Sequence, residues 1–495
     1  MKILIVSPVF PDSFWSFKYV LKFIRKKAVF PPLGLLTMAA MLPKKWEKRL
    51  VDMNIDKLSN KDIIWADYVF IGAMYVQIKS VEEIIERCKK FNTKIVAGGP
   101  IFTMTYKSYI DRIDHFVLNE AEITLPKFLN DLENGNAKQI YTSSEFAGIK
   151  ESPKPLWDLI NLKRYAHMSI QYTRGCPFAC DFCNVTTLFG RKVRSKTSTQ
   201  IITELNSIYE NGYKGPIFFV DDNFIGIIPS LKRDLLPALI NWKKHHPGIS
   251  FYTEVSINIA DDSELMDMMR LAGFNQVFIG IETPNNEGLA ESNKTQNHNR
   301  DLIKDIKKIQ RHGLQVQGGF IVGFDADTED IFQNQIDFIQ KSGITTAMVG
   351  LLQAFPGTGL YNRMKEKNRL LTAITTGDNF DGTTNIIPAT MHIDTLVNGY
   401  KHILAQIYSP KNYYKRIKVF LEEYENQGIE EPINVNSTWA FWSSILYLGL
   451  LGKERFQYWN LLIWTSFRHP KYLPMAVNLS IFGLHFRKTA KIYVK

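Results

Sequence analysis

Short apolar runs alternate with helical patterns along the first part of the chain. The runs KILIVSPVF, RLVDMN, YVFIGAM, KIVAGG and HFVLNE are rich in Val, Ile and Phe and end at turn residues, which is typical of buried strands. Between them, PLGLLTMAAMLP and SVEEIIERCKKF carry apolar residues at helical spacing. This alternation predicts a doubly wound, Rossmann-like parallel sheet over residues 1–135, followed by a linker over 136–167.

Six further strand-then-helix units fill residues 168–356. Their strands are SIQYTRG, PIFFVDDN, SFYTEVSIN, QVFIGIET, QVQGGFIVGF and TAMVGLLQAF. Six units predict a partial (β/α)6 barrel that is open on one side, because a closed barrel of this kind needs eight. Barrel enzymes keep their chemistry at the carboxyl ends of the strands. We therefore expect a site at that rim of the barrel.

Residues 357–495 lack alternating strands and predict a helical C-terminal cap domain. The apolar run from Trp439 to Gly452 spans fourteen residues, fewer than the roughly twenty that a membrane-spanning helix needs. Aromatic residues there interleave with Lys and Arg, a mixture that suits the boundary between lipid headgroups and acyl chains. The alternative is that the aromatic residues form the core of a cap over the barrel mouth. These residues are Trp439, Trp442, Tyr447, Tyr458, Trp459, Trp464 and Phe467.

The composition, with 45% hydrophobic and 22% charged residues, is that of an ordinary globular protein. The net charge of +11 suits nucleic acid, an anionic membrane surface or acidic ligands. Because the basic residues are scattered and no nucleic-acid-binding motif is present, we expect no nucleic-acid partner. The start MKILIVSPVF reads as a strand and not as a signal peptide. We expect a cytoplasmic protein, with peripheral association at the inner membrane surface as an extension of that prediction.

The main chemical feature is a group of three cysteines, Cys176, Cys180 and Cys183, in the segment GCPFACDFCN. They are three of only four cysteines in the chain, which predicts a thiolate-ligated metal centre. Three thiolates cannot complete a tetrahedral zinc site, and Cys88 lies far upstream in a helical stretch. The CxxxCxxC spacing suits a 4Fe-4S cluster that leaves one iron open for a ligand. Zinc remains the alternative.

This motif, with Phe182 just before the last cysteine, resembles the radical S-adenosylmethionine (SAM) superfamily. The resemblance implies that the open iron binds SAM, and that a low-potential donor such as flavodoxin or ferredoxin supplies the electron. It also implies that carboxylates at the strand ends accept hydrogen bonds from the amino group and ribose of SAM. These are Asp222, Glu254 and Glu282. The alternative is that Asp222 or Asn223 caps the next helix.

The N-terminal module resembles the cobalamin-binding domain that precedes many radical SAM barrels. Gly98 and Gly99 after one strand and Glu120 after the next match that family. Glycine there would let a large corrin approach the backbone. The DxHxxG motif that supplies a cobalt ligand in many cobalamin proteins is absent, so the implied cobalamin would meet water, a non-histidine side chain or nothing on its lower face. A flavodoxin-like module without a cofactor is the alternative.

Four longer motifs resemble one branch of cobalamin-binding radical SAM proteins, which includes hopanoid C-2 methylase and the bacteriochlorophyll side-chain methylases. They cover residues 14–18, 219–226, 407–410 and 483–487. The resemblance implies methylation of an unactivated carbon in a small molecule or lipid, such as a polycyclic hopanoid. The rival functions are a cobalamin-dependent cyclase or rearrangement enzyme, a radical SAM enzyme whose first domain is vestigial, and a non-enzymatic iron–sulfur membrane adaptor or sensor.

Overall fold

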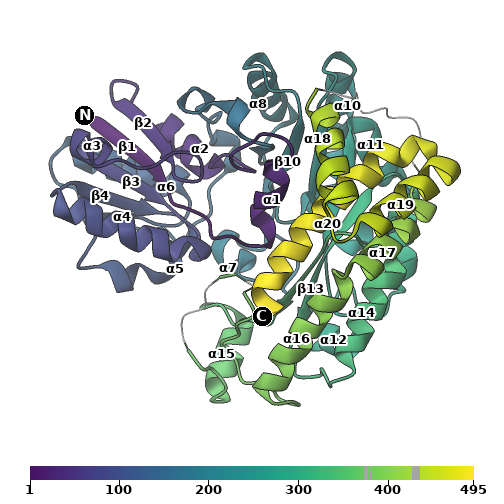
Figure 1. Cartoon of the computed structure of the whole chain (residues 1–495). Helices are drawn as coiled ribbons and strands as arrows, with labels where there is room; N and C mark the ends of the chain where they lie inside the picture. The colour runs from purple at the N-terminus through teal and green to yellow at the C-terminus, as the bar shows by residue number, and fades with distance from the viewer. Residues whose placement is uncertain (373–376, 379–380, 426–434, 495) are drawn as a thin grey trace.

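The computed structural model describes residues 1–372, 377–378, 381–425 and 435–494, with only the backbone for 435–438. Two α/β modules lie side by side, the N-terminal module at the left of Figure 1 and the larger one at the right. The C-terminal helices pack along the outside of the second module (Figure 1). A six-stranded sheet forms the centre of each module.

The first sheet is parallel, with the strand order β2-β1-β3-β4-β5-β6. This confirms the predicted doubly wound module, because the strand order reverses between β1 and β3. β6 lies after residue 135, so the sheet extends beyond the predicted end of the module. The strands are β1 (Lys2–Ser7), β2 (Glu47–Asp52), β3 (Tyr68–Gly72), β4 (Lys94–Gly98), β5 (His115–Val117) and β6 (Ile140–Tyr141), and the helices are α2 (Leu33–Met41), α3 (Asn60–Trp65), α4 (Ile78–Lys90), α5 (Pro100–Thr105) and α6 (Ala121–Glu133).

The second sheet is also parallel, with the order β14-β13-β12-β11-β10-β7. β7 and β14 form its two edges and do not pair with each other, so the six-stranded barrel is open, as predicted. The strands are β7 (Met168–Ile170), β10 (Pro216–Phe219), β11 (Ser250–Glu254), β12 (Phe274–Glu282), β13 (Gln315–Val322) and β14 (Ala347–Leu351); the main helices are α8 (Ser198–Glu210), α10 (Leu236–His245), α11 (Ser263–Ala272), α13 (Leu302–Arg311) and α14 (Ile331–Ser342).

Alternation along β12 separates the two faces of the barrel sheet. Val277, Ile279 and Ile281 are fully buried in the core, whereas Gln276 and Phe278, at the alternating positions, are only half-buried. Because successive side chains of a strand point to opposite faces, the first set packs against the outer helices and the second faces the inside of the barrel. The half-buried inner face is where the barrel can receive a ligand.

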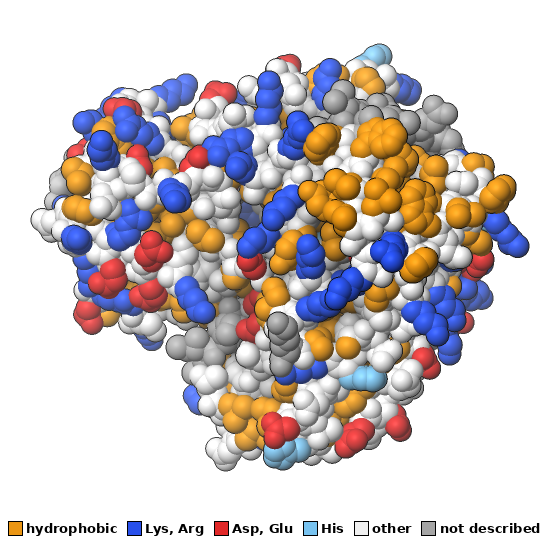
Figure 2. Space-filling view, viewed as in Figure 1, with side chains coloured by type: hydrophobic (Ala, Val, Ile, Leu, Met, Phe, Trp, Pro, Cys, Tyr) orange, Lys and Arg blue, Asp and Glu red, His pale blue; other side chains and the backbone are white. Residues whose placement is uncertain are grey.

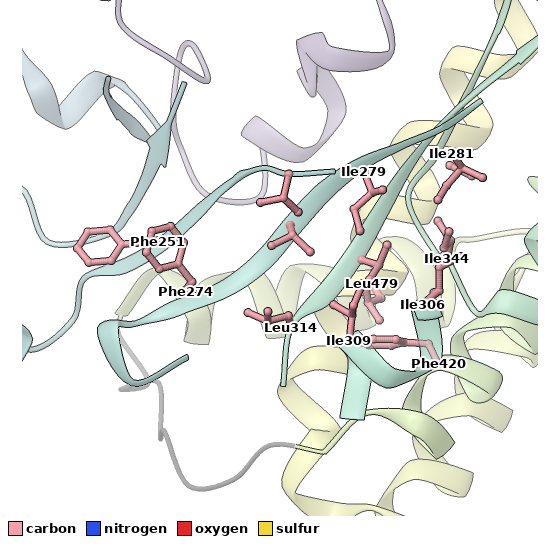
Figure 3. Close-up of a cluster of buried hydrophobic side chains, with 14 of the residues drawn as sticks. Phe251, Phe274, Ile279, Ile281, Ile306, Ile309, Leu314, Ile344, Phe420 and Leu479 are labelled. Carbon is pink, nitrogen blue, oxygen red and sulfur yellow. The ribbon is translucent and has the colours of Figure 1, made fainter. Parts of the chain in front are cut away.

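The C-terminal helices share the core of the barrel. Ile309 of α13, Phe420 of α17 and Leu479 of α20 belong to one buried cluster (Figure 3). α16 and α17 are separate helices because Ser409 caps α17 at Asn412 N and Pro410 occupies its first turn. The helices are α15 (Gly359–Glu366), α16 (Ile393–Ile407), α17 (Pro410–Glu423), α18 (Val435–Ser444), η10 (Ile445–Leu450), α19 (Arg455–Arg468) and α20 (Leu473–Val494).

The segment that follows β1 reaches from the first module into the second. It contains η1 (Phe14–Ser16) and α1 (Lys18–Leu21), and α1 lies beside α20 in Figure 1. The Phe14 ring stacks on Phe486 of α20 at 4.6 Å, and Trp15 meets Phe278 of β12 edge-on at 5.5 Å. The N-terminal module therefore contributes a side chain to the inner face of the barrel.

No helix in the described part of the chain has both the length and the apolar character that crossing a membrane requires.

Candidate active site

The cysteine loop runs from β8 (Thr173–Arg174) to α7 (Val185–Phe189), and all three of its cysteines are half-buried. Gly175 begins the loop with a φ of +94°, and a Cβ there would lie 2.9 Å from the Lys192 carbonyl oxygen. Only glycine fits this turn without strain. The close contact between Gly175 and the backbone at Lys192 therefore fixes where the loop with Cys176, Cys180 and Cys183 begins.

Two distant segments hold the cysteine loop at Asp181. Its backbone N–H donates to the Ser292 carbonyl at 2.9 Å, and its own carbonyl accepts from the Leu360 N–H at 3.0 Å. The Arg363 guanidinium lies 3.1 Å from the Asp181 carboxylate. Gly359 has no room for a side chain, because a Cβ would lie 1.9 Å from Asp181 Oδ1. The loop is therefore fixed between the segment after β12 and the start of α15.

Phe182, which the sequence predicts as a cofactor contact, packs in an apolar cluster beside the cysteines. Its ring meets Phe324 edge-on at 6.2 Å, and residues of α15 complete the cluster. This packing fixes the direction of the loop between Cys180 and Cys183. A contact between Phe182 and a cofactor stays a prediction.

Burial disfavours the deprotonated, anionic form of these cysteine thiols when no metal is bound. It raises the pKa of Cys183 to about 12, and it also raises the pKa of Cys176. A metal bound to sulfur removes the thiol proton, so metal ligation would offset this burial cost. Within the described part of the chain, no three His, Cys, Asp or Glu side chains converge on a point that could hold a single metal ion. Three half-buried sulfurs on one short loop are a donor set that suits an iron–sulfur cluster.

Lys294 is a buried cation at this site that the sequence analysis missed. Its Nζ lies 2.6 Å from Glu282 Oε1, and the two side chains are only 11% and 8% exposed. Burial alone would lower the Lys294 pKa, but Glu282 and then Cys180 raise it well above its ordinary value. The neighbouring Gln296 amide donates to Cys180 Sγ at 3.7 Å. Anionic sulfur at Cys180 thus has a fixed cation and a hydrogen-bond donor close by.

Glu282 ends β12 in a strained conformation. Its φ is +64°, which non-glycine residues rarely adopt, and the strand register shifts between Gly280 and Glu282. A Cβ on Gly280 would lie 2.4 Å from Glu282 Oε1 and 2.8 Å from Lys294 Nζ. Strain of this kind persists only where the surroundings hold it, and it clusters at functional sites.

Two buried amides hold this strained strand end. Asn297 Nδ2 donates to the carbonyls of Gly280 and Ile281 at 2.9 and 3.0 Å, and Gln335 Nε2 donates to the Glu282 carbonyl at 3.3 Å. Sequence reasoning missed both amides. The polar run SNKTQN after the fourth barrel strand was a signal for Lys294 and Asn297. Gln335 lies on the buried side of α14, where the pattern gave no signal.

Three carboxylates gather at the ends of β10 and β11. Asp221 accepts hydrogen bonds from Thr173 N and Oγ1, so it anchors β8, and burial raises its pKa to about 7. Burial raises the pKa of Asp222 to about 6. For Glu254, burial and then its neighbours Asp222 and Asp221 raise the pKa to about 8. No side chain caps η7 (Phe224–Ile227), so the alternative role of Asp222 as a helix cap is absent.

Glu254 is the carboxylate without a partner. It is half-buried, and among the described residues no hydrogen-bond donor or salt-bridge cation reaches it. A buried charge is costly unless it is paired, so this site favours a ligand that brings a cation or N–H and O–H donors. The structure therefore brings Asp222 and Glu254 close together. Glu282, in contrast, is already paired with Lys294 in a salt bridge.

Gly98 and Gly99, at the carboxyl end of β4 in the first sheet, are required by the packing of the backbone around them. A Cβ on Gly98 would lie 2.8 Å from the Val117 carbonyl oxygen, and a Cβ on Gly99, whose φ is +88°, would lie 3.0 Å from the Ala73 carbonyl oxygen. The close approach of β3, β4 and β5 thus accounts for both glycines. Access of a corrin to this backbone stays a prediction.

Glu120 joins the two modules. Arg174 and Arg194 lie 2.9 and 2.7 Å from its two carboxylate oxygens, and the Ala147 N–H also donates to it. Arg174 and Arg194 belong to the ribbon of β8 and β9 (Arg194–Ser195), which flanks the cysteine loop. Both oxygens of Glu120 therefore have protein partners, and the residue positions the first module against the cysteine loop.

Apolar side chains are exposed where the first sheet reverses its strand order. Val9 and Phe10 follow β1, and Met74 follows β3. The crevice beyond the carboxyl ends of the strands at such a point is where sheets of this class bind ligands. These residues could hold the apolar faces of a large cofactor.

Three of the four branch motifs meet in one aromatic cluster. Tyr408 lies 5.3 Å from Phe486 and donates from its hydroxyl to the Ala347 carbonyl at 2.6 Å. His485 Nε2 donates to the Phe14 carbonyl at 2.9 Å, across nearly the whole length of the chain. These motifs therefore hold α20 and the segment after β1 together, and the fourth, residues 219–226, carries Asp221 and Asp222.

Comparison with known proteins identifies the class. Residues 170–339 match the family model described as the radical SAM superfamily, and residues 358–495 match a domain of unknown function, DUF4070. The fold resembles that of the cobalamin-dependent S-adenosylmethionine radical enzyme OxsB solved with aqua-cobalamin bound, with a TM-score of 0.63 and 16% identity over 99% of this chain and 80% of that chain. The match of the whole architecture confirms the predicted fold class.

Curated relatives identify the branch. The chain is 38% identical to an uncharacterized methyltransferase of Synechocystis and 33% identical to the hopanoid C-2 methylase of Rhodopseudomonas palustris, each over 84% of this chain and 78% of the relative. It is 26% identical to the bacteriochlorophyllide d C-12(1)-methyltransferase of Chlorobaculum tepidum over 69% of this chain and 75% of that protein. The chain therefore belongs to the radical SAM methyltransferase family that includes hopanoid C-2 methylase.

Proposed function

We propose that this enzyme methylates an unactivated carbon of an apolar small molecule or lipid, and that its substrate is a polycyclic lipid such as a hopanoid. The observation that carries the proposal is the pairing of a half-buried three-cysteine loop with the partnerless carboxylate of Glu254 at the same rim. Membership of the methyltransferase family supports the reaction class.

Each site residue has a role in this proposal. Cys176, Cys180 and Cys183 would ligate a 4Fe-4S cluster, with Lys294 and Gln296 offsetting the negative charge on sulfur. Asp222 and Glu254 would accept hydrogen bonds from the amino group and ribose of SAM. Glu282 would keep Lys294 charged and in place, while Phe182 would form an apolar wall.

When bound, the cluster with SAM would supply the removal of a hydrogen atom from the substrate, and cobalamin would supply the methyl group that replaces it. The exposed Val9, Phe10 and Met74 at the edge of the first sheet would pack against the corrin. Gly98 and Gly99 would leave the adjacent backbone accessible. Glu120 would hold this module against the cysteine loop, which keeps the two reaction centres at a fixed separation.

The inner face of the barrel supports an apolar substrate. Phe218 and Tyr252 stack there at 4.8 Å, and Trp15 lies against Phe278. Flat aromatic surfaces favour the packing of ring systems without polar groups. A lipid of this kind resides in a membrane, so the enzyme would work as a peripheral protein at a membrane surface. A low-potential donor such as flavodoxin or ferredoxin would supply the electron.

A complemented deletion strain tests the cluster and the substrate together. We expect the strain to lack a methyl group on a polycyclic lipid, and expect wild type and Cys88→Ala to restore it while Cys180→Ala does not. Cys88 is buried in the first module, so its replacement removes a thiol without touching the loop. The purified Cys180→Ala protein, reconstituted without oxygen, should lose iron–sulfur absorbance and SAM cleavage.

Other outcomes assign other functions. An unchanged lipid profile would contradict the lipid substrate. In the purified wild type, 5′-deoxyadenosine without S-adenosylhomocysteine or a methylated product would indicate a cyclase or rearrangement reaction. Retained SAM cleavage by Cys180→Ala would contradict the cluster assignment itself.

A further inference from the structure

The C-terminal helices carry an apolar surface that faces solvent. Its residues recur along each helix at intervals of three, four and four positions, which places them on one side of a helix. Their exposed fractions range from 38% to 86%. On α18 and η10 they are Trp439, Trp442, Leu446 and Leu450, and on α19 they are Phe456, Trp459, Ile463 and Phe467; these eight residues form the aromatic face.

The aromatic face is separate from the core-facing side of the same helices. Tyr458 and Leu461 of α19 are fully buried, as is Leu448 of η10, and the hydroxyls of Tyr458 and Ser444 lie 2.8 Å apart. Each helix therefore already packs one apolar side against the protein. Figure 2 shows the second side as a patch of hydrophobic side chains over the region of α18 and α19. Such exposed patches mark interaction sites.

The structure also divides the aromatic residues that the sequence analysis grouped together. Tyr458 is buried and Trp464 half-buried, so these two belong to the core of the helical region. Trp439, Trp442, Tyr447 and Phe467 are exposed. The core interpretation therefore holds for Tyr458 and Trp464, and the lipid-boundary interpretation stays a prediction for the exposed rings, to which Trp459 also belongs.

The charge around the aromatic face is positive. Residues 435–494 include seven Lys and Arg and one acidic residue, Glu454. Glu454 is buried and paired with Arg487, so this part of the chain presents no acidic side chain to solvent. Lys453, Arg455, Arg468 and Lys471 are exposed next to the face, and the Arg25 guanidinium lies 4.1 Å over the Trp439 ring. The surface is complementary to an anionic partner.

We propose that the aromatic face docks the protein onto an anionic lipid bilayer. Trp rings with Lys and Arg beside them suit the level of the headgroups, and Leu, Ile and Phe suit the acyl chains just below. A second copy of this chain is a poorer occupant, because two such faces would bring like charges together. The proposal concerns binding and goes beyond the proposed reaction.

Vesicle co-sedimentation of the full-length protein tests this docking. We expect binding to vesicles of phosphatidylcholine mixed with phosphatidylglycerol, and weaker binding to phosphatidylcholine alone or at high salt. For the double variant Trp442→Ser and Phe467→Ser, the partition coefficient onto these vesicles should fall roughly tenfold or more, because the variant lacks two of the rings that would enter the bilayer. Ile64→Ser, an equally exposed apolar residue on α3 of the first module, should bind like wild type.

Three outcomes would overturn the proposal. The wild type could stay unbound by anionic vesicles, or the double variant could bind as well as wild type. In the third outcome, the wild type forms a dimer in solution, the double variant is a monomer, and neither protein binds vesicles. That result would assign the aromatic face to a second copy of the chain. Because both rings are exposed, the melting temperature of the double variant should equal that of wild type. The assay needs neither cluster nor SAM, so its result is independent of the proposed reaction.

Discussion

At the scale of the residue, the carboxyl groups of the site differ in the partners that the protein gives them. Lys294 forms a salt bridge with Glu282, whereas Glu254 lies near Asp222 and Asp221 and forms none with any described residue; the more distant charge of Lys294 offsets only part of the rise in the Glu254 pKa. Burial and the two neighbouring carboxyl groups raise the pKa of Glu254 to about 8, which favours its protonated form. A ligand with a cationic amine would reverse that preference, so binding would release a proton.

Glu254→Gln should change how stability depends on pH in the protein without SAM. The unfolded carboxyl has a pKa of about 4.3 and the folded one a pKa of about 8. Between these values the folded state holds more protons, so the wild type loses stability as the pH rises from about 4 to about 8. The variant lacks this loss, and its melting temperature should exceed that of wild type by a growing margin from pH 5 to pH 8.

The same variant should bind SAM less tightly, by about tenfold, because the neutral amide is a weaker acceptor for a cationic amine. Glu133→Gln, which changes an exposed carboxylate on α6, serves as the control and should leave both measurements unchanged. A melting-temperature difference that stays constant across this pH range would contradict the assigned environment of Glu254.

At the scale of the element, the ends of strands and helices bring the two modules together. The start of α6 carries Glu120 and Glu122, and the ribbon of β8 and β9 carries Arg174 and Arg194. These four side chains are nearly buried, so they hold each other in place more firmly than surface pairs do. The cysteine loop lies between β8 and β9, and its position therefore depends on this contact.

Glu120→Gln should loosen the contact between the modules. The change leaves Arg194 without its buried counter-ion, and we expect a loss of about 3 kcal/mol in the free energy of unfolding. Hydrogen exchange at the Ala147 N–H, which donates to Glu120, should become faster. Glu133→Gln is a matched control, because its pair with Lys45 is largely exposed and should contribute about 0–1 kcal/mol. Equal stability of the two variants would show that the contact is not important for the assembly.

At the scale of the whole molecule, the barrel and the C-terminal helices are one cooperative body. α16 and α17 pack against α14, and the buried cluster runs without a break from β12 to α20. The Phe14 segment adds the first module to this body through α20. We therefore expect the C-terminal helices to unfold together with the barrel.

Phe420→Ala should test this shared core. Phe420 is fully buried, so the cavity should cost about 3–5 kcal/mol. Hydrogen exchange should accelerate in α14 of the barrel and in α20 together. Phe467→Ala removes a ring of the same size from the surface and should change stability by less than about 0.5 kcal/mol. Acceleration confined to the C-terminal helices would show a separate folding unit.

Local patterns in the sequence were enough for the elements and for part of the site. The alternation of apolar residues predicted all the long strands of both sheets, and the cysteine spacing singled out the loop that we predict to bind a metal. The two-residue β6 escaped prediction, because a strand that short has no period to read. Asp222 and Glu254 were found because polar residues at the ends of apolar strands stand out from their surroundings.

The sequence by itself determined the strand and helix periods, the cysteine spacing and the family, since these are properties of neighbouring residues. Tertiary structure alone decided the partners. Glu120 met Arg174 and Arg194, Lys294 met Glu282, and Phe14 met Phe486 because folding placed distant segments in contact. It also decided which apolar side of α19 is covered, because a helical pattern shows that a side is apolar but not what lies against it.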